Sequence, residues 1–288
     1  MTSPRGNTTR ELIEKKGDFH TIVCMNRIGS HVERENPLTG AKLRGAEVVQ
    51  INLSAPQTWQ SPKSKGDEEM LAKSEIPIWV HAPYLVNPSS INEDVLQKSK
   101  SALITQSRAA ARINAKGLVV HGGHPTGNGS VDDAIDNWLR VLDGWEPETM
   151  ICIENTAGGK AAAARNLETL NKLFERLKKE GHACGFVFDT CHAFAGGITL
   201  TDTVKEVVSA IGRIDLLHLN DSKDQYNSSR DRHENLGDGQ IDPDWLIDVL
   251  TKVDCDVVVE TPGGYEAQRD DILWVRERVS KYNNKGAI

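Results

Sequence analysis

Histidine and carboxylate residues stand at or directly after the ends of short apolar runs at six successive places in the chain: His81, His121, Glu154, Asp189, His218 and Glu260. Such groups are unfavourable in a buried strand unless they have a partner, because burying an unsatisfied polar group costs roughly 2–7 kcal/mol. Mixed imidazole and carboxylate donors are typical of zinc, manganese or iron sites, whereas magnesium and calcium prefer oxygen ligands alone. The pattern therefore indicates a transition-metal centre.

Three further donors lie in the segments that follow two of these runs. His192 comes three residues after Asp189, and Asp231 and His233 lie in the polar segment after His218. A single polar residue at a strand end is more often a helix cap, but five histidines, two aspartates and two glutamates in this order need another explanation. Catalytic zinc uses about three protein ligands, so nine donors suit roughly three ions better than one.

The elements that must position these residues are short apolar runs separated by amphipathic segments. The runs cover residues 21–24, 48–53, 78–80, 118–120, 150–153, 185–188, 215–219 and 256–259. Continuous apolar runs of this length predict parallel strands that are covered on both faces. The segments between them read as helices: 165–180 has Leu167, Leu170, Phe174 and Leu177 at helical spacing, and Asp242 precedes Pro243 as an N-cap.

Eight strands that alternate with helices predict a parallel α/β sheet. We favour a single-domain TIM-type (β/α)8 barrel over a doubly wound open sheet, and such a barrel places its active site at the C-terminal mouth of the strands. We expect the barrel to span residues 21–283, with a mobile N-terminal extension (1–20) and a C-terminal tail (284–288).

Composition narrows the class of protein further. The 288 residues are 38% hydrophobic, no apolar stretch approaches a membrane span, and the first twenty residues lack the apolar core of a signal peptide. Five cysteines without a CxxC pair are typical of reduced thiols. We therefore expect a cytoplasmic protein without a membrane partner. The formal charge of −7 argues against a nucleic-acid partner, unless bound cations change the balance.

Six sequence blocks resemble the signature motifs of a known family: HAPYLVN (81–87), IENTAGG (153–159), FDTCHAFAGG (188–197), HLNDSK (218–223), DRHENLGDG (231–239) and VVETPGG (258–264). The family is that of endonuclease IV, also called AP endonuclease family 2, whose members are trinuclear-zinc enzymes that cleave DNA at apurinic or apyrimidinic (abasic) sites. The resemblance runs from about Ile28 to about Tyr265, in the family's order and spacing.

The resemblance implies a ligand set and a reaction. His81 and His121 would bind one zinc ion, and Glu154 would bridge it to a second ion, which Asp189, His218 and Glu260 complete. His192, Asp231 and His233 would hold the third, and Mn²⁺ could replace Zn²⁺ at one or more sites. A metal-bound hydroxide would attack the phosphorus 5′ of the abasic site, with Glu154 as the catalytic residue that bridges the ions. The products would be a 3′-hydroxyl and a 5′-deoxyribose phosphate, and 3′-phosphatase and 3′-phosphodiesterase activities would accompany them.

The same resemblance implies contacts with double-stranded DNA that carries abasic sites or 3′-blocked ends. Tyr84 and Leu85 match the family's wedge into the duplex, and Lys223, Arg230 and Arg232 are candidates to pair with phosphates. Gln57 stands where some members have an arginine that enters the DNA, and residues 33–40 (ERENPLTG) replace a glycine-rich turn. Three divalent ions would bring the formal charge of −7 to about −1, which weakens the charge objection. We expect a monomer.

Two other functions remain open from the residues alone. A metal-dependent sugar isomerase or epimerase on a related barrel would use one or two ions, and would leave His192, Asp231 and His233 without a purpose. A protein that binds damaged DNA without cleaving it would have no reason to keep nine metal donors. His31 matches a family histidine near the site, whereas His124 falls on no ligand position.

Overall fold

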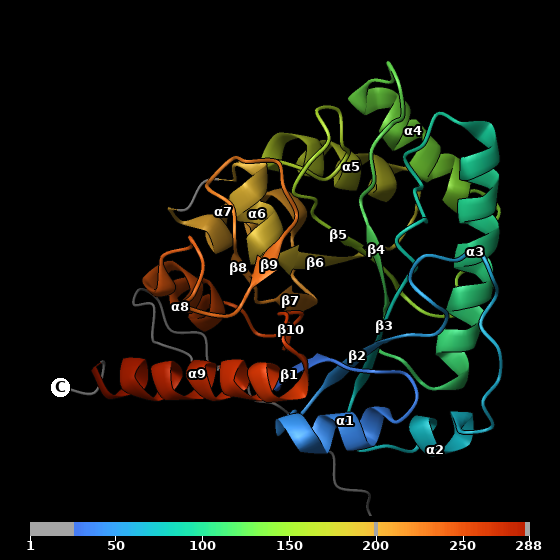
Figure 1. Ribbon diagram of the computed structural model, residues 1–288. Helices are drawn as coiled ribbons and strands as arrows, with labels where there is room; N and C mark the ends of the chain where they lie inside the picture. Colours follow the sequence, from blue (N-terminus) through green and yellow to red (C-terminus); the bar gives the residue numbers. More distant parts are fainter. Residues whose placement is uncertain (1–25, 199–200, 286–288) are drawn as a thin grey trace, which may run out of the picture.

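A closed barrel of eight parallel strands forms the centre of the computed structural model, which describes residues 26–198 and 201–285. The strands follow one another around the barrel in the order β1-β10-β7-β6-β5-β4-β3-β2. Their bounds are Ile28–His31 (β1), Val49–Asn52 (β2), Ile78–His81 (β3), Leu118–His121 (β4), Ile151–Glu154 (β5), Gly185–Asp189 (β6), Leu216–His218 (β7) and Asp256–Val259 (β10). Closure confirms the predicted TIM-type barrel and excludes the open sheet (Figure 1).

The first strand differs from the prediction. Residues 21–24 and the extension predicted for residues 1–20 lie outside the described residues, and β1 is formed instead by the sequence IGSH. Gly29 explains why this strand carries no hydrophobic signal: a Cβ atom there would lie 1.7 Å from the carbonyl oxygen of Val48 on the adjoining chain segment. Glycine has no side chain, so a strand that needs glycine at a close backbone contact shows only a weak apolar pattern in the sequence. The consequence is that His31 also stands at a strand end.

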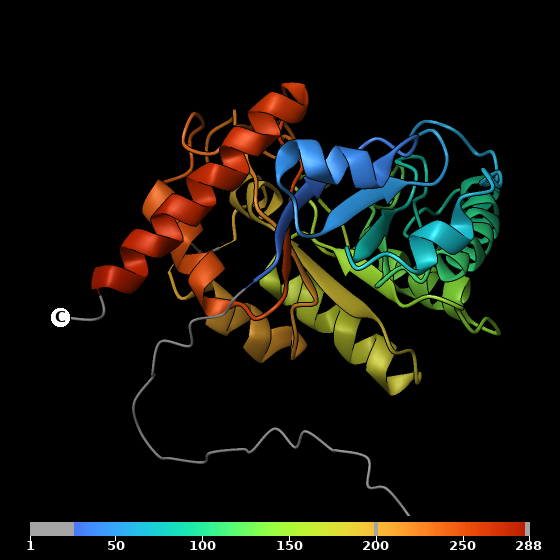
Figure 2. The same ribbon diagram turned by 90° about the horizontal axis from the view of Figure 1, so that it is seen from below.

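Helices surround the barrel on its outside (Figures 1 and 2). Their bounds are Pro37–Arg44 (α1), Glu68–Ala72 (α2), Glu93–Arg112 (α3), Val131–Leu142 (α4), Leu167–Lys179 (α5), Thr190–Gly196 (α6), Thr203–Ile211 (α7), Pro243–Lys252 (α8) and Gly264–Lys285 (α9). Two predictions are confirmed. The side chain of Asp242 caps α8 by accepting a hydrogen bond from the Asp244 N–H, and α5 buries its apolar face, where Phe174 meets Phe186 of β6 edge-on at 5.7 Å. Within the described residues, no helix is long and apolar enough to cross a membrane.

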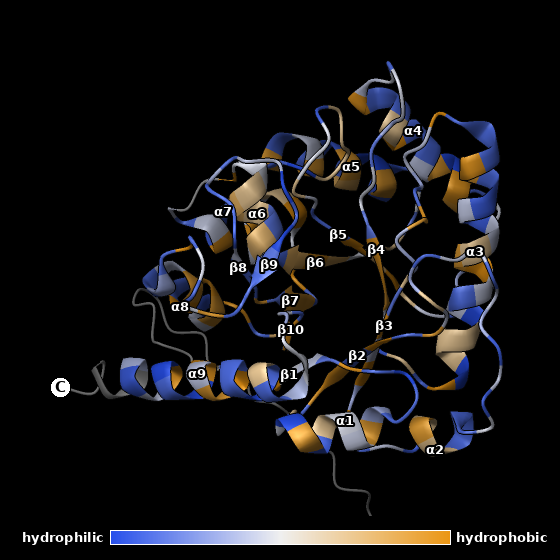
Figure 3. Cartoon of the chain, in the orientation of Figure 1, coloured by the Kyte–Doolittle hydropathy of each residue, from blue (hydrophilic) through white to orange (hydrophobic). Residues whose placement is uncertain are grey.

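Two layers of side chains fill the interior of the barrel. The lower layer is apolar, and the upper layer, nearer the C-terminal ends of the strands, is polar. Because side chains alternate between the two faces of a strand, residues two positions apart point the same way. The lower layer is a packed apolar cluster made of Val48, Trp79, Val119, Cys152, Val187, Leu216 and Val258. The residues two positions further on are Gln50, His81, His121, Glu154, Asp189, His218 and Glu260. Figure 3 shows the same concentration of apolar residues in the strands, beside helices of mixed polarity.

A small antiparallel ladder, which the sequence analysis did not predict, lies above β7. It pairs Asp221–Ser222 (β8) with His233–Glu234 (β9), and β8 packs against α6 (Figure 1). The buried carboxylate of Asp221 holds the following turn by accepting hydrogen bonds from the N–H groups of Gly237, Gly239 and Ile241, at 3.0–3.1 Å. This ladder places His233 over the mouth of the barrel.

Candidate metal centre

All nine predicted donors converge at the C-terminal mouth of the barrel. Their donor atoms form groups within which every pair lies no more than 4.8 Å apart: His81, His121 and Glu154; Glu154, Asp189, His218 and Glu260; His192, Asp231 and His233. We call these the first, second and third groups. Neighbouring strands bring the first two together, because the barrel register pairs His121 with Glu154 and Asp189 with His218. The grouping is the one that the sequence motifs implied.

Glu154 lies at the centre of the three groups and is fully buried. Its Oε2 atom is 3.3 Å from Nε2 of both His81 and His121. Its Oε1 atom is 3.0 Å from Nδ1 of His218 and 3.2 Å from Nδ1 of His192. Burial raises the pKa of Glu154, but the imidazoles of His218 and His121 outweigh it and hold that pKa well below its usual range. The carboxylate of Glu154 is therefore ionised, and a buried anion needs positive charge beside it.

Hydrogen bonds to the far sides of the imidazoles determine which ring nitrogen is free to bind a cation. The Nε2–H of His218 donates to Oε1 of Gln50 at 2.9 Å, while Nε2 of the same Gln50 donates to Glu260 at 2.6 Å. The Nδ1–H of His81 donates to the carbonyl of Ala82 at 2.7 Å. Oriented in this way, Nδ1 of His218 and Nε2 of His81 turn their lone pairs toward Glu154.

The third group shows the same arrangement. His192 Nδ1–H donates to the carbonyl of Asn155 at 2.9 Å, and His233 Nδ1–H donates to the carbonyl of Glu260 at 3.3 Å. Both Nε2 atoms are buried without a hydrogen bond, and they lie 3.1 and 3.2 Å from one oxygen of Asp231. Burial lowers the pKa of His233, but Asp231 and Asp189 outweigh it and raise that pKa to about 9.

These contacts test whether the residues fit a metal. A lone pair that faces a carboxylate oxygen at about 3 Å is repulsive unless a proton or a cation lies between the two atoms. A bound divalent cation satisfies both partners at once, and the orienting bonds to backbone carbonyls and Gln50 are those that metal-bound imidazoles usually make. The donor set fits transition-metal ions at all three groups.

Two polar residues of β2 support this site, although the sequence analysis did not single them out. Gln50 orients His218 and Glu260, and Asn52 donates to the carbonyl of His81 at 3.0 Å. The side chain of His31 lies between Glu260 (3.0 Å) and Asn52 (2.9 Å), so it stands beside the site as expected. The signal that was available is their spacing, since Gln50 and Asn52 follow Val48 on the inward face of one strand.

Asp271 of α9 supports the site from behind. Its carboxylate accepts hydrogen bonds from Asn235 Nδ2 and the Leu236 N–H, both at 2.8 Å, and from the Thr261 hydroxyl. It thereby ties together the segments that carry His233 and Glu260. Burial raises the pKa of Asp271 above its ordinary value of 3.8. Sequence reasoning missed it, because an acidic residue in a helix usually faces solvent.

The predicted DNA-contacting residues lie around the rim. Tyr84 is 57% exposed, and its ring centroid lies 5.7 Å from that of His81 and 5.8 Å from that of His121. Leu85 is half-buried and Gln57 is exposed. The Tyr84 N–H donates to the carbonyl of Pro56 at 2.8 Å, which ties the two rim segments together. Partial desolvation beside the site, with Glu260 nearby, raises the pKa of Tyr84 to about 12, so the phenol stays neutral.

The three predicted phosphate-binding cations are exposed but already paired. Arg232 makes two hydrogen bonds of 2.6 Å with Asp224, and Arg230 lies 3.5 Å from the same carboxylate. Lys223 lies 3.6 Å from Glu234. Surface ion pairs of this kind contribute only about 0–1 kcal/mol. A phosphate could therefore replace these carboxylate partners at little cost.

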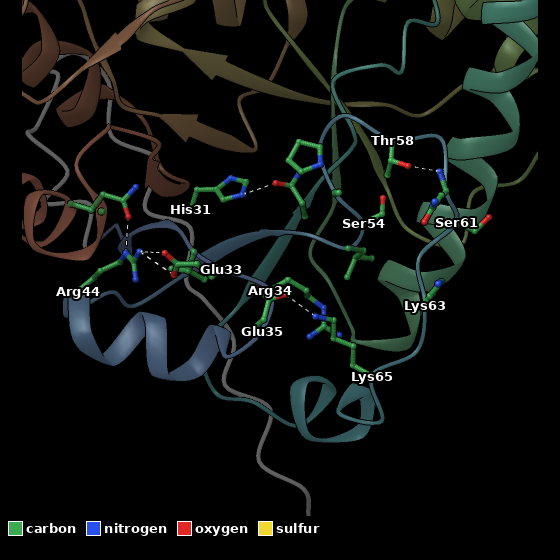
Figure 4. Close-up of a pocket in the computed structure, with 18 residues that line it drawn as sticks. His31, Glu33, Arg34, Glu35, Arg44, Ser54, Thr58, Ser61, Lys63 and Lys65 are labelled. Carbon is green, nitrogen blue, oxygen red and sulfur yellow. Dashed lines mark hydrogen bonds and ion pairs between the residues drawn. The ribbon is translucent and has the colours of Figure 1, made fainter.

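A cavity of about 710 Å³ opens beside His31, on the side of the mouth formed by the segments after β1 and β2. Figure 4 shows His31 and Arg34 on one side of it and Ser61 and Lys63 on the other. Glu33, Arg34 and Glu35 belong to the segment that departs from the family pattern, and they pair with Arg44, Asp67 and Lys65 respectively. Residues 33–35 thus line this cavity and contribute none of the nine donors.

The comparisons define first the class and then the family. Residues 41–278 match the family model of the xylose isomerase-like TIM barrel. The probable endonuclease 4 of Mycobacterium tuberculosis (strain ATCC 25177 / H37Ra) is 44% identical over 251 residues, which cover 87% of this chain and 98% of the relative. The corresponding protein of Mycobacterium leprae (strain Br4923) is 42% identical over 253 residues, with 88% and 99% covered. The chain belongs to the endonuclease IV family.

Solved structures agree with this assignment. Endonuclease IV from Thermus thermophilus superposes with a TM-score of 0.76 at 26% identity, over 88% of this chain and 99% of that one. A D-tagatose 3-epimerase-like protein superposes with a TM-score of 0.71 over 90% of this chain and 99% of that one. Its sequence identity is 19%, so this likeness shows only a shared fold. The family predicted from the motifs is confirmed, and with it the prediction of an AP endonuclease of DNA repair rather than a sugar isomerase.

Proposed function

We propose that this protein incises double-stranded DNA on the 5′ side of abasic sites, acting as a monomer, and leaves a 3′-hydroxyl and a 5′-deoxyribose phosphate. The observation that carries the proposal is the set of oriented imidazoles in three groups that meet at Glu154. A phosphodiester cleavage needs concentrated positive charge around one phosphate. Three groups of metal donors around one carboxylate could hold this positive charge as bound cations.

We propose one zinc ion for each group, with manganese able to replace zinc. His81, His121 and Glu154 would hold the first ion, Glu154, Asp189, His218 and Glu260 the second, and His192, Asp231 and His233 the third. The bound ions supply an activated water and the charge that stabilises an in-line displacement at phosphorus. Glu154 keeps the first two groups at one separation because its two oxygens face opposite sets of imidazoles.

The rim residues provide recognition. Tyr84 stands exposed directly above the first group, so a ring inserted beside the lesion would leave the abasic sugar over Glu154. Leu85 continues this wedge, and apolar wedges unstack neighbouring bases. Lys223, Arg230 and Arg232 lie near the third group, where they would exchange their carboxylate partners for flanking phosphates. Gln57 lies on the neighbouring segment and would contact the duplex beside Tyr84. The same site would remove blocking groups from 3′ ends.

The test is incision of a duplex with one abasic site, compared with the same duplex undamaged. We expect incision at the lesion alone, products with a 3′-hydroxyl end, and loss of activity after metal chelation. Equal cutting of the undamaged duplex, or a cut on the 3′ side of the lesion, would overturn the proposal. Isomerisation of a ketose sugar without DNA cleavage would instead support the sugar isomerase alternative.

A further inference from the structure

Cys191 lies beside the third group but has no role in the proposed reaction. Its Sγ atom, a carboxylate oxygen of Asp189 and a ring nitrogen of His233 lie within 4.8 Å of one another. The side chain is fully buried, at the start of α6. The other cysteines that the structure describes lie away from the mouth. Cys152 is within β5, and Cys184 and Cys255 directly precede β6 and β10. A thiol thus faces two residues that also serve the proposed zinc groups.

The contacts of this thiol leave its sulfur available. It donates to the carbonyl of Arg232 at 3.8 Å and also forms a hydrogen bond with the side chain of Ser222, and both bonds are weak because sulfur is a weak donor and acceptor. A coordinating thiol is deprotonated by the ion that it binds.

The spacing of the other two donors matches a metal site. Asp189 Oδ2 lies 3.8 Å from Nε2 of His233. A nitrogen and an oxygen bound to tetrahedral zinc at about 2.0–2.2 Å are separated by roughly 3.3–3.6 Å, so a separation of 3.8 Å suits an ion that forms slightly longer bonds. The same His233 nitrogen is buried without a hydrogen bond, so it can accept an ion on this side as well as on the Asp231 side.

We infer that Asp189, Cys191 and His233 form a second, overlapping site, which takes a thiophilic divalent cation such as Cd²⁺ and expels the cation of the third group. The inference rests on the proposed metal centre, because both sites use His233. Thiolate donors select soft ions, whereas the third group offers only imidazole and carboxylate. Binding forms a sulfur–cadmium bond and releases the thiol proton to water. One His233 nitrogen cannot bind two ions, so the zinc ion of the third group leaves, whereas Asp189, with two carboxylate oxygens, can remain a donor of the second group.

The experiment titrates Cd²⁺ into the zinc-loaded protein and records two signals. The first is the ultraviolet charge-transfer absorption of a thiolate–cadmium bond, and the second is zinc released to a chromogenic chelator. We expect both signals at one equivalent per chain in the wild type and in Cys184→Ser, a control thiol at the opposite end of the barrel. In Cys191→Ser the absorption should disappear, and the Cd²⁺ concentration needed to release zinc should rise at least about tenfold.

The outcomes separate this inference from the proposed function. Zinc-loaded Cys191→Ser should keep its full zinc content and its incision of abasic duplex, because the thiol serves neither. An absorption band unchanged in Cys191→Ser, or no band in the wild type, would overturn the inference and leave the endonuclease proposal standing. If Cys191→Ser fails to fold, Cys191→Ala is the second variant, and ¹¹³Cd NMR of the wild type decides whether sulfur coordinates the ion.

Discussion

Nδ1 of His218 lies 3.0 Å from Oε1 of Glu154, with both side chains fully buried inside the barrel. The other nitrogen of the ring donates to Gln50, so the lone pair of Nδ1 points at an anion. Burial lowers the pKa of His218, but Glu260 and Glu154 outweigh it and raise that pKa to about 9. A proton on Nδ1, or a cation in its place, therefore lies between this nitrogen and Glu154, and the site is built to hold positive charge at this point.

Elemental analysis of the purified protein should find close to three ions per chain, mostly zinc. The reason is that nine donors form three groups, each large enough for one catalytic ion with an open position. A fully loaded preparation that holds only one ion would contradict the trinuclear centre and favour the isomerase alternative.

Glu154→Gln should reduce incision of abasic duplex by at least about a hundredfold, since changes to groups that merely orient a ligand already cost 10–100-fold. A neutral amide cannot satisfy four imidazoles that converge on an anion. The variant should remain folded by circular dichroism, because its volume is unchanged. Glu175→Gln, on the exposed side of α5, is the control and should cleave normally. Wild-type rates in Glu154→Gln would show that this residue does not bridge the ions.

Tyr84→Ala combined with Leu85→Ala should weaken binding of abasic duplex while the metal content stays at the wild-type level. Unstacking costs roughly a few kcal/mol per base step, which the wedge offsets. Removal of a 3′-phosphate at a frayed end needs less unstacking, so it should suffer less than incision within an intact duplex. Equal losses on both substrates would assign the two residues to general binding, and lost zinc would assign them to support of His81.

Arg230→Ala with Arg232→Ala should flatten the salt dependence of duplex binding. Each phosphate contact contributes about 0.9 to the slope of log K against log salt, so the double variant should lose roughly two units. Arg213→Ala, which lies just before β7 at the opposite end of the barrel, is the control. A drop in affinity with an unchanged slope would mean that the two arginines only hold the loop through Asp224.

Asp271→Asn should change how stability depends on pH. Because burial raises the pKa of Asp271 above 3.8, folding favours its protonated form. The stability that this group contributes is therefore complete below pH 3.8 and is lost as the pH rises through the raised value. An asparagine does not titrate, so the melting temperature of the variant relative to wild type should rise as the pH increases from about pH 4 towards neutrality. A constant difference across this range would refute the raised pKa.

The amino-acid sequence by itself predicted the donor set and favoured a barrel over an open sheet. Strand-end histidines and carboxylates gather at one mouth of a barrel, because the carboxyl ends of its parallel strands all lie on the same side. That argument needs no knowledge of the partner strands, so His81, His121, Glu154, Asp189 and His218 could be predicted as a ring. The motifs then sorted the nine donors into three groups, and the structure brings the same three groups together.

Only the tertiary structure decided which nitrogen of each imidazole faces the centre and which strand begins the barrel. Gln50 is 168 residues from His218 in the chain, and it comes within 2.9 Å of it only because closure of the barrel sets the register of all eight strands. β1 could not be predicted for a related reason. Position 29 needs glycine because a side chain there would collide with the carbonyl of Val48, and this contact exists only after folding. Hydrogen-bond partners that are distant in sequence leave no local pattern, because neither side chain needs the other until the chain is folded.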